Sequence, residues 1–291
     1  MRLLKPRRDL KRSRIWMIKT PLAPMYAHRG FHDKPIIPEN SMPAFRRAVK
    51  RGWGVEFDVH LIKDGSLVIF HDDTLVRETG APGVIEDLDL AGVKALRLEG
   101  TDEQIPTFDE LLDLFENNPV DVEGSPYYGK PVPLLIELKT AGKNYKDLVE
   151  KVCRRLETYT GEYVIESFDP RAVLELKKKW PHITRGQLVQ NFLTHDLDRA
   201  KAQSFMLTEM LFNHAAKPDF VSYRFADKDM HSLKRIHKND NIAEAVWTVR
   251  SPKSFRLARK KGYTAIFEKF DPENMPEETK KSKAKKRSDR R

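Results

Sequence analysis

The chain has 291 residues, of which 40% are hydrophobic and 33% are charged, and its net charge is +10. This is the composition of a soluble globular protein, and barrels of about 250 residues form single domains. A single cysteine excludes an intramolecular disulfide, and no segment approaches the roughly 20 apolar residues of a membrane-spanning helix. We expect a cytoplasmic protein, with peripheral membrane contact as an alternative.

The positive charge lies at the two ends. Residues 1–20 hold eight basic side chains and one acidic one, and residues 279–291 hold the same numbers; without these segments, 37 basic and 41 acidic side chains are left. We therefore predict a basic tail at 1–20, a domain at 21–272 and a disordered basic tail at 273–291. The tails are either solvated or bind an anionic membrane, and no specific nucleic-acid partner is expected.

Short segments rich in β-formers alternate with helical patterns along the chain. The predicted strands are 25–27, 55–59, 134–138, 163–166, 186–189, 220–222, 245–249 and 263–267, and the predicted helices lie near 41–51, 107–116, 145–158, 170–179, 198–213, 227–237 and 252–261. Thr107 and Glu110 form a capping-box pattern, and Asp169 before a proline marks another helix start. A further strand at 67–70 follows a turn and completes a hairpin.

Strand alternating with helix predicts a parallel sheet, and eight such units favour a closed (β/α)8 barrel, the TIM barrel. An open doubly wound sheet is the main alternative. That fold usually carries a Gly-rich phosphate loop after its first strand, where this chain has His28-Arg29-Gly30. We expect the stretch 73–105 to be an insertion after the second unit that lies over one end of the barrel.

Acidic residues occupy two of the predicted strands. Glu56 and Asp58 are two residues apart, so both side chains leave the same face of their strand, and Glu137 follows on the next strand of the parallel alternation. Buried carboxylates side by side need neutralisation. Three carboxylates without a thiol suit one divalent cation, Mg²⁺ or Ca²⁺. Salt bridges to Arg29 and Lys139 are the structural alternative.

Two histidines also stand where barrel enzymes carry their chemistry, at strand ends. His28 follows the first strand and His71 ends the hairpin arm, and an imidazole can accept or donate a proton at neutral pH. Arg29 and Lys139 are candidate phosphate partners. His60 continues the alternation of its strand, but we expect it at the edge of the barrel.

Short motifs follow one another along most of the chain: HRG at 28–30, PENS at 38–41, EFDV at 56–59, KDG at 63–65, HD at 71–72, IPT at 105–107, ELK at 137–139, SFD at 167–169 and WTV at 247–249. In this order and spacing, from about residue 26 to about 267, the sequence resembles the glycerophosphodiester phosphodiesterase family.

The resemblance implies a barrel of the phospholipase-C-like phosphodiesterase type and assigns roles to the matching residues. His28 and His71 are implied as general base and acid, Glu56, Asp58 and Glu137 as cation ligands, Arg29 and Lys139 as phosphate ligands, Glu39 and Asn40 as supports of the site, and Phe168 and Trp247 as pocket walls. The substrate's own glycerol hydroxyl would attack phosphorus, and water would open the cyclic phosphate. Helix capping by Asn40 or Ser41, and core packing of the two aromatic rings, are the structural alternatives.

The sequence departs from the family at two positions. The last strand usually ends in a segment with Asp, where this chain has Glu268, and an Asn that often follows the WTV motif is Arg250. We expect both on the leaving-group side, away from the hydrolytic centre. Arg250 either meets a negatively charged headgroup or forms a salt bridge with Glu268, and we favour the salt bridge.

The implied function is hydrolysis of a small-molecule glycerophosphodiester to glycerol 3-phosphate and an alcohol. One alternative is a lysophospholipase D-type hydrolase at the membrane surface, which the basic tails favour. The other is a non-catalytic barrel that binds phosphodiesters, against which the paired histidines argue.

Overall fold

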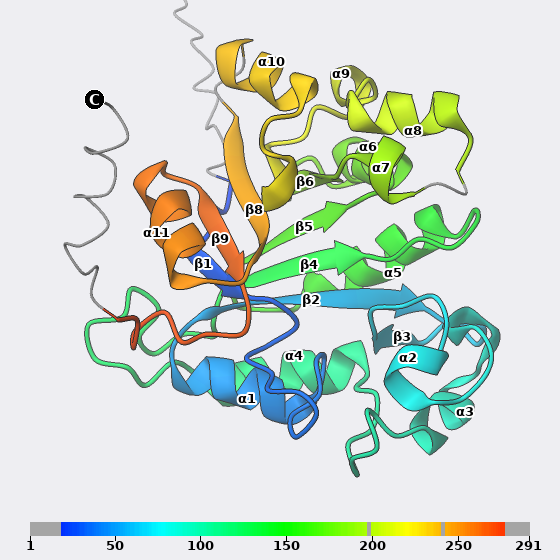
Figure 1. Ribbon diagram of the computed structural model, residues 1–291. Coiled ribbons are helices and arrows are strands. Elements are labelled where there is room, and N and C mark those ends of the chain that lie inside the picture. Colours follow the sequence, from blue (N-terminus) through cyan, green and yellow to red (C-terminus); the bar gives the residue numbers. More distant parts are fainter. Residues whose placement is uncertain (1–18, 197–198, 240–241, 277–291) are drawn as a thin grey trace, which may run out of the picture.

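The computed structural model describes residues 19–196, 199–239 and 242–276, and within them eight parallel strands form a closed barrel (Figure 1). The strands are β1 (Met25–Ala27), β2 (Gly54–Leu61), β4 (Leu134–Leu138), β5 (Tyr163–Ser167), β6 (Arg185–Val189), β7 (Phe220–Arg224), β8 (Ala243–Val249) and β9 (Thr264–Phe267). Because β1 pairs with both β9 and β2, the sheet closes on itself. The predicted barrel is confirmed, and each strand lies within a few residues of its predicted range.

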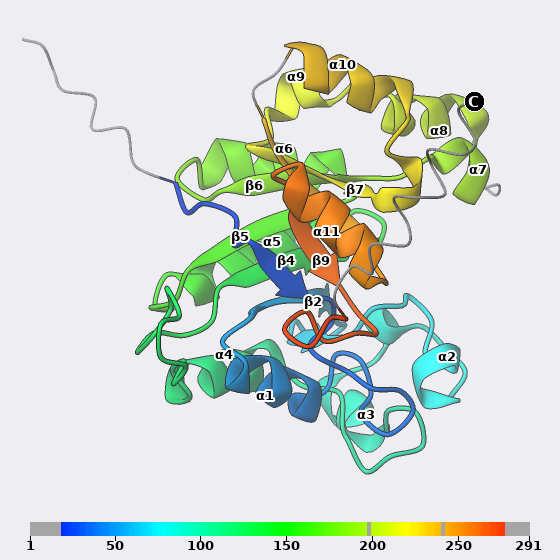
Figure 2. The same ribbon diagram turned by 60° about the vertical axis from the view of Figure 1, so that its left-hand side comes forward.

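Helices surround the barrel and connect its strands. They are α1 (Met42–Lys50), α4 (Phe108–Asn117), α5 (Tyr145–Leu156), α6 (Pro170–Lys179), α10 (His231–Asn239) and α11 (Pro252–Lys260), with a 3-10 turn η2 (Phe225–Asp227) before α10. The capping box of Thr107 and Glu110 is present, and Asp169 and Ser41 cap α6 and α1 through their side chains. Helices α1 and α4 lie side by side (Figures 1 and 2).

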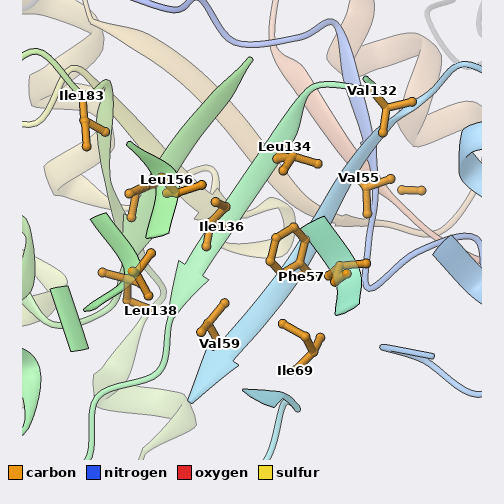
Figure 3. Packing of buried hydrophobic residues seen from close by; sticks show 14 of the residues in the cluster. Val55, Phe57, Val59, Ile69, Val132, Leu134, Ile136, Leu138, Leu156 and Ile183 are labelled. Atoms are coloured by element: carbon orange, nitrogen blue, oxygen red, sulfur yellow. The ribbon is translucent and has the colours of Figure 1, made fainter. Parts of the chain in front are cut away.

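Alternation along the strands separates the barrel interior from its outer face. On β2, Val55, Phe57 and Val59 belong to the main apolar core, which includes residues of the surrounding helices. Figure 3 shows these three residues beside Ile136 and Leu138 of β4. The residues between them on β2 point the opposite way, into the barrel. The alternation along β2 therefore places its polar side chains in the barrel interior.

Residues 73–105 form the predicted insertion. The strand β3 (Leu67–Ile69) pairs antiparallel with β2 as expected, and the insertion that follows contains α2 (Val76–Thr79), the 3-10 turn η1 (Ile85–Asp87) and α3 (Leu90–Ala95). It has a small apolar core of its own, which includes Phe70, Leu75 and Ile85. Helices α2 and α3 lie together beyond β3, at one end of the barrel (Figures 1 and 2).

The single helix predicted near 198–213 is wrong. The connection from β6 to β7 instead contains α7 (Phe192–His195), α8 (Lys201–Thr208) and α9 (Asn213–Ala216). The break falls at Met210, whose φ of 51° lies in the left-handed region that cannot continue a helix. The face that α8 buries contains Ser204 and Thr208 rather than a continuous apolar stripe, so periodicity could not define this helix.

Most of the two predicted basic tails lies outside the described residues. Those next to the barrel pack onto it: Lys19 pairs with Asp219 at 2.7 Å, and Glu273 accepts a hydrogen bond from the Trp53 indole at 2.8 Å. In the part of the chain that the structure describes, no helix combines the length and apolar character needed to cross a membrane.

Candidate active site

Three acidic side chains from two neighbouring strands meet inside the barrel. Glu56 and Asp58 are two residues apart on β2, and Glu137 on β4 is the register partner of Asp58. All three are at most 8% exposed, and one carboxylate oxygen of each lies within 4.8 Å of the others. The structure therefore brings together the three residues that the sequence singles out as cation ligands.

The electrostatics of this carboxylate cluster (Glu56, Asp58 and Glu137) are unfavourable for three negative charges. Burial, with two carboxylates nearby, raises the pKa of Glu56 well above its ordinary value, and burial raises the pKa of Glu137 to about 7. Burial also opposes ionisation of Asp58, but cations led by Lys139 hold its pKa below the ordinary range. An added positive charge would relieve this repulsion.

The structure supports both interpretations of the cluster, a cation site and a set of salt bridges to Arg29 and Lys139. Lys139 Nζ lies 2.9 Å from Glu137 Oε1 and 3.5 Å from Asp58 Oδ1, and Arg29 Nε lies 3.5 Å from Asp58 Oδ2, so the ion pairs exist. Yet Asp58 Oδ1 is buried and has no hydrogen bond among the described residues. Several carboxylate oxygens and no thiol at one point form a donor set that fits a hard divalent cation.

The loop after β1 binds the cluster through its backbone and side chains. Arg29 takes a left-handed conformation with φ 54°, and its backbone N–H donates to Glu56 Oε2 at 2.9 Å. Its guanidinium donates to Glu39 at 2.7 Å, while the Asn40 amide donates to Asp58 Oδ2 at 2.9 Å. A positive φ is uncommon outside glycine, so these contacts hold a costly backbone in place.

His28 is oriented by a carboxylate that directly follows the last strand of the barrel, β9. Its Nδ1 lies 2.6 Å from Glu268 Oε2, and its Nε2 lies 4.0 Å from Glu56. Because an ionised carboxylate only accepts hydrogen bonds, Nδ1 carries the proton and Nε2 is left as the free acceptor. Arg250 Nε donates to the other oxygen, Glu268 Oε1, at 2.7 Å. His32 Nε2 lies 3.6 Å from Glu268 Oε2.

The expected salt bridge between Arg250 and Glu268 is present, but the expectation that Glu268 lies away from the hydrolytic centre is wrong. Barrel closure places the end of β9 beside β1, where His28 begins the loop, and His28 N donates to the Phe267 carbonyl at 2.9 Å. Glu268 becomes a neighbour of His28 only through closure of the barrel, which the local sequence does not show. The position of Glu268 at a strand end was a signal that could have marked it as a candidate site residue.

His71 has a carboxylate partner of its own, and the insertion supports that pair. His71 Nδ1 lies 2.5 Å from Asp72 Oδ1, and Arg77 of α2 donates to Asp72 at 2.5 and 2.8 Å. The same guanidinium donates to Glu39 at 2.8 Å and to the buried Glu78 at 2.7 Å. Arg77 therefore links Asp72, the partner of His71, to Glu39, the partner of Arg29.

Two further buried polar residues, His60 and Glu166, lie on the barrel strands β2 and β5. His60 is fully buried and pairs with Glu86 of the insertion at 2.6 Å, which places it at the edge of the barrel as expected. Glu166 on β5 is the register partner of Glu137, and burial together with Glu137 raises its pKa well above the ordinary value. The sequence interpretation missed Glu166, which no motif marks.

A small cavity of about 40 Å³ joins the candidate groups. It is lined by His28, Arg29, Glu56, His71, Glu137, Glu166, Phe168, Leu188, Trp247 and Ile266. The rings of Phe168 and Trp247 meet edge to face with centroids 5.6 Å apart. Both aromatic residues border the cavity and also pack against buried core residues, and Asp58 and Lys139 contact the lining. A larger groove of about 990 Å³ shares Glu137 and Phe168 with this cavity.

Comparison with protein families matches residues 28–270 to the model described as the glycerophosphoryl diester phosphodiesterase family. A glycerophosphodiester phosphodiesterase of Caldanaerobacter subterraneus is 32% identical over 197 residues, which are 64% of this chain and 75% of that protein. A putative glycerophosphodiester phosphodiesterase of Bacillus subtilis is 30% identical over 253 residues, 82% of this chain and 91% of its own length.

Solved structures share the fold. A phosphodiesterase of Oleispira antarctica, solved with the product sn-glycerol-3-phosphate, superposes with a TM-score of 0.66 at 24% identity, covering 85% of this chain and 93% of that one. A glycerophosphodiester phosphodiesterase of Parabacteroides distasonis has a TM-score of 0.64 at 20% identity, with 84% and 91% covered.

Glu78 generates a prediction about stability. Burial, with Glu39 nearby, raises its pKa from 4.5 to about 8 in the folded protein. An acid with a raised folded pKa makes the protein less stable as pH rises between its unfolded and folded values. Glu78→Gln resembles the protonated acid, so it should reduce the loss of unfolding free energy between about pH 5 and about pH 8.5, measured with urea. The exposed Glu123→Gln is the control; identical pH dependence in wild type and Glu78→Gln would contradict the prediction.

Proposed function

The chain belongs to the glycerophosphoryl diester phosphodiesterase family, and we propose that it hydrolyses glycerophosphodiesters to glycerol 3-phosphate and an alcohol. The observation that carries the proposal is the convergence of two histidines, an arginine and three carboxyl groups on one small cavity. A phosphodiester is an anion that needs charge neutralisation and proton transfer, and this set of groups offers both.

We propose that Glu56, Asp58 and Glu137 hold one divalent cation, Mg²⁺ or Ca²⁺. The donor set supports this assignment, and so does Asp58 Oδ1, which accepts no hydrogen bond from the described residues. When bound, such a cation neutralises charge on the phosphoryl oxygens. Arg29 and Lys139 lie against the same carboxylates and would bind the phosphate from the protein side.

In the proposed reaction, His28 accepts the proton of the substrate's glycerol hydroxyl as that oxygen bonds to phosphorus. His71 donates a proton to the departing alcohol oxygen, and water then opens the cyclic phosphate with the two roles reversed. Burial and the neighbouring Arg29 lower the pKa of His28 to about 4, which keeps its Nε2 unprotonated at neutral pH. Burial also lowers the pKa of His71, but the charge of a bound phosphate and Asp72 both favour its protonated form.

We further propose that the barrel domain spans residues 21–272, that the protein is cytoplasmic and that its basic end segments contact anionic membranes. Composition and charge support these proposals. The end segments lie mostly outside the described residues.

Release of glycerol 3-phosphate from a panel of glycerophosphodiesters tests the proposed function. Wild type should release it, and His28→Ala and His71→Ala should each fold normally and lose about 10²–10⁴-fold in rate, the usual contribution of acid–base catalysis. His214→Ala, an exposed histidine outside the site, is the matched control. Absence of release by wild type would instead favour a non-catalytic binding barrel, and a normal rate in either variant would remove that histidine from the mechanism.

Glu268 is proposed as the positioning residue for His28. Glu268→Gln removes the charge that fixes the Nδ1 proton, so we expect kcat to fall roughly 10–100-fold, as for other residues that orient a working histidine. KM should change little, because Glu268 does not line the small cavity. Glu273→Gln makes the same change five residues further on, at a carboxylate bound to Trp53, and should keep kcat. A normal kcat in Glu268→Gln would show that His28 does not depend on the charge of Glu268.

A further inference from the structure

Glu166 is a buried carboxyl group for which the proposed reaction has no role. It belongs to β5, is 1% exposed and borders the small cavity of about 40 Å³. Its Oε2 is buried and has no hydrogen bond among the described residues. A buried polar atom without a partner costs stability, so we looked for the partner that Glu166 would acquire.

The barrel interior around Glu166 offers it little. Val164, two residues earlier on the same strand, belongs to an apolar cluster that includes Phe220. The hydroxyl of Ser222 on β7 acts to lower the pKa of Glu166, against the larger effect of burial, but Ser222 Oγ is itself buried without a hydrogen bond in the part of the chain that the structure describes. The cavity is therefore the place from which a hydrogen-bond partner of Glu166 can come.

The other residues that line the cavity either have proposed roles in the reaction or are largely apolar. Proton transfer, phosphate binding and cation binding account for His28, Arg29, Glu56, His71 and Glu137. Rings and aliphatic side chains complete the wall, from Phe168, Leu188, Trp247 and Ile266. The indole Nε1 of Trp247 is also buried without a hydrogen bond within the described ranges. The lining thus contains one acceptor, Glu166, and one donor, Trp247, that the reaction leaves unused.

An alcohol hydroxyl matches this pair of groups. It donates one hydrogen bond and accepts others, and a carboxyl group can accept from it whether or not that carboxyl is ionised. Glu166 is the register partner of Glu137, and neighbouring strands lie about 4.8 Å apart. When one oxygen of a small polyol lies at the carboxylate cluster, Glu166 is therefore placed beside the next oxygen of the same molecule.

We propose that Glu166 binds the terminal hydroxyl of the substrate's glycerol, the hydroxyl that takes no part in the reaction, with the Trp247 indole as its donor. The proposal rests on the proposed function and assigns a specificity-determining residue to that site. A glycerophosphodiester carries this hydroxyl one carbon beyond the one that attacks phosphorus, whereas a diester of propane-1,2-diol has a methyl group there. The methyl group would leave the buried carboxyl without a partner, so Glu166 favours the glycerol diester.

Two substrates that differ only in this hydroxyl test the proposal. Glycerophosphocholine and the matching phosphocholine diester of propane-1,2-diol both keep the attacking hydroxyl and the choline leaving group. Choline release is measured for each with added Mg²⁺ or Ca²⁺. Wild type should prefer glycerophosphocholine by roughly 10–100-fold in kcat/KM, the effect of one hydrogen bond to a buried carboxyl group.

Variants of Glu166 test whether this residue causes the preference. Glu166→Met puts an apolar side chain of similar length into an apolar interior, so it should fold, and it should bring the ratio of the two kcat/KM values close to one. A variant that only disturbed Glu137 or its cation would slow both substrates alike and leave the ratio unchanged. Glu166→Gln keeps an oxygen acceptor and should retain most of the preference.

A control variant and a binding measurement complete the design. Glu162 is exposed and directly precedes β5, so Glu162→Met should keep the wild-type ratio. Calorimetric binding of glycerol 3-phosphate and of propane-1,2-diol 1-phosphate gives the same comparison for a variant that turns over too slowly. Glu166→Met should bind the two phosphates equally, whereas wild type should prefer glycerol 3-phosphate.

The outcomes separate this proposal from the one on which it rests. Equal kcat/KM for the two diesters in wild type would overturn the hydroxyl site and leave the proposed function standing. An unchanged preference in Glu166→Met would show that another group binds the hydroxyl and would overturn the assignment to Glu166. Absence of turnover for both diesters in wild type would overturn the proposed function, and this proposal with it.

Discussion

The burial of three carboxylates side by side is the constraint on which the rest of the site depends. Glu56, Asp58 and Glu137 lie within 4.8 Å of one another in the barrel interior, where like charges repel strongly. Such an arrangement costs stability unless cations compensate for it, and the chain provides Lys139 and Arg29 at 2.9–3.5 Å from the cluster. Their compensation is only partial, which leaves room for the further positive charge of the cation that we propose.

The histidines are held from outside the cluster in two similar ways. His28 is fixed by Glu268, directly after the last strand, and Arg250 holds Glu268 in turn. His71 is fixed by Asp72, which Arg77 of the insertion holds. In both pairs a carboxylate takes the Nδ1 side and leaves Nε2 available. The insertion at 73–105 therefore contributes to the site through Arg77, which also reaches Glu39 beneath Arg29. Supports of this kind keep reacting groups in place before substrate binds.

The sequence predicted the barrel and most of the site because both depend on local patterns. Alternation on β2 determines that Glu56 and Asp58 point inward, and parallel pairing makes Glu137 their neighbour. The partner of His28 could not be found in this way, because Glu268 is 240 residues distant and adjacent only through barrel closure. The predicted helix near 198–213 failed for another reason: its sequence has no clear apolar stripe, so periodicity could not show where the helix breaks. The groove of about 990 Å³, which that connection partly lines, was likewise not predicted from the sequence.

Calorimetric titration with Mg²⁺ and with Ca²⁺ tests the account of the cluster most directly. Wild type should bind one divalent cation, and Asp58→Asn should bind none, since it removes the carboxylate whose oxygen lacks a hydrogen bond. Glu166→Gln is the control, because it resembles the protonated state of a buried carboxyl beside the cluster and should bind as wild type does. Saturable binding of equal affinity in Asp58→Asn, or no binding in wild type, would contradict the account.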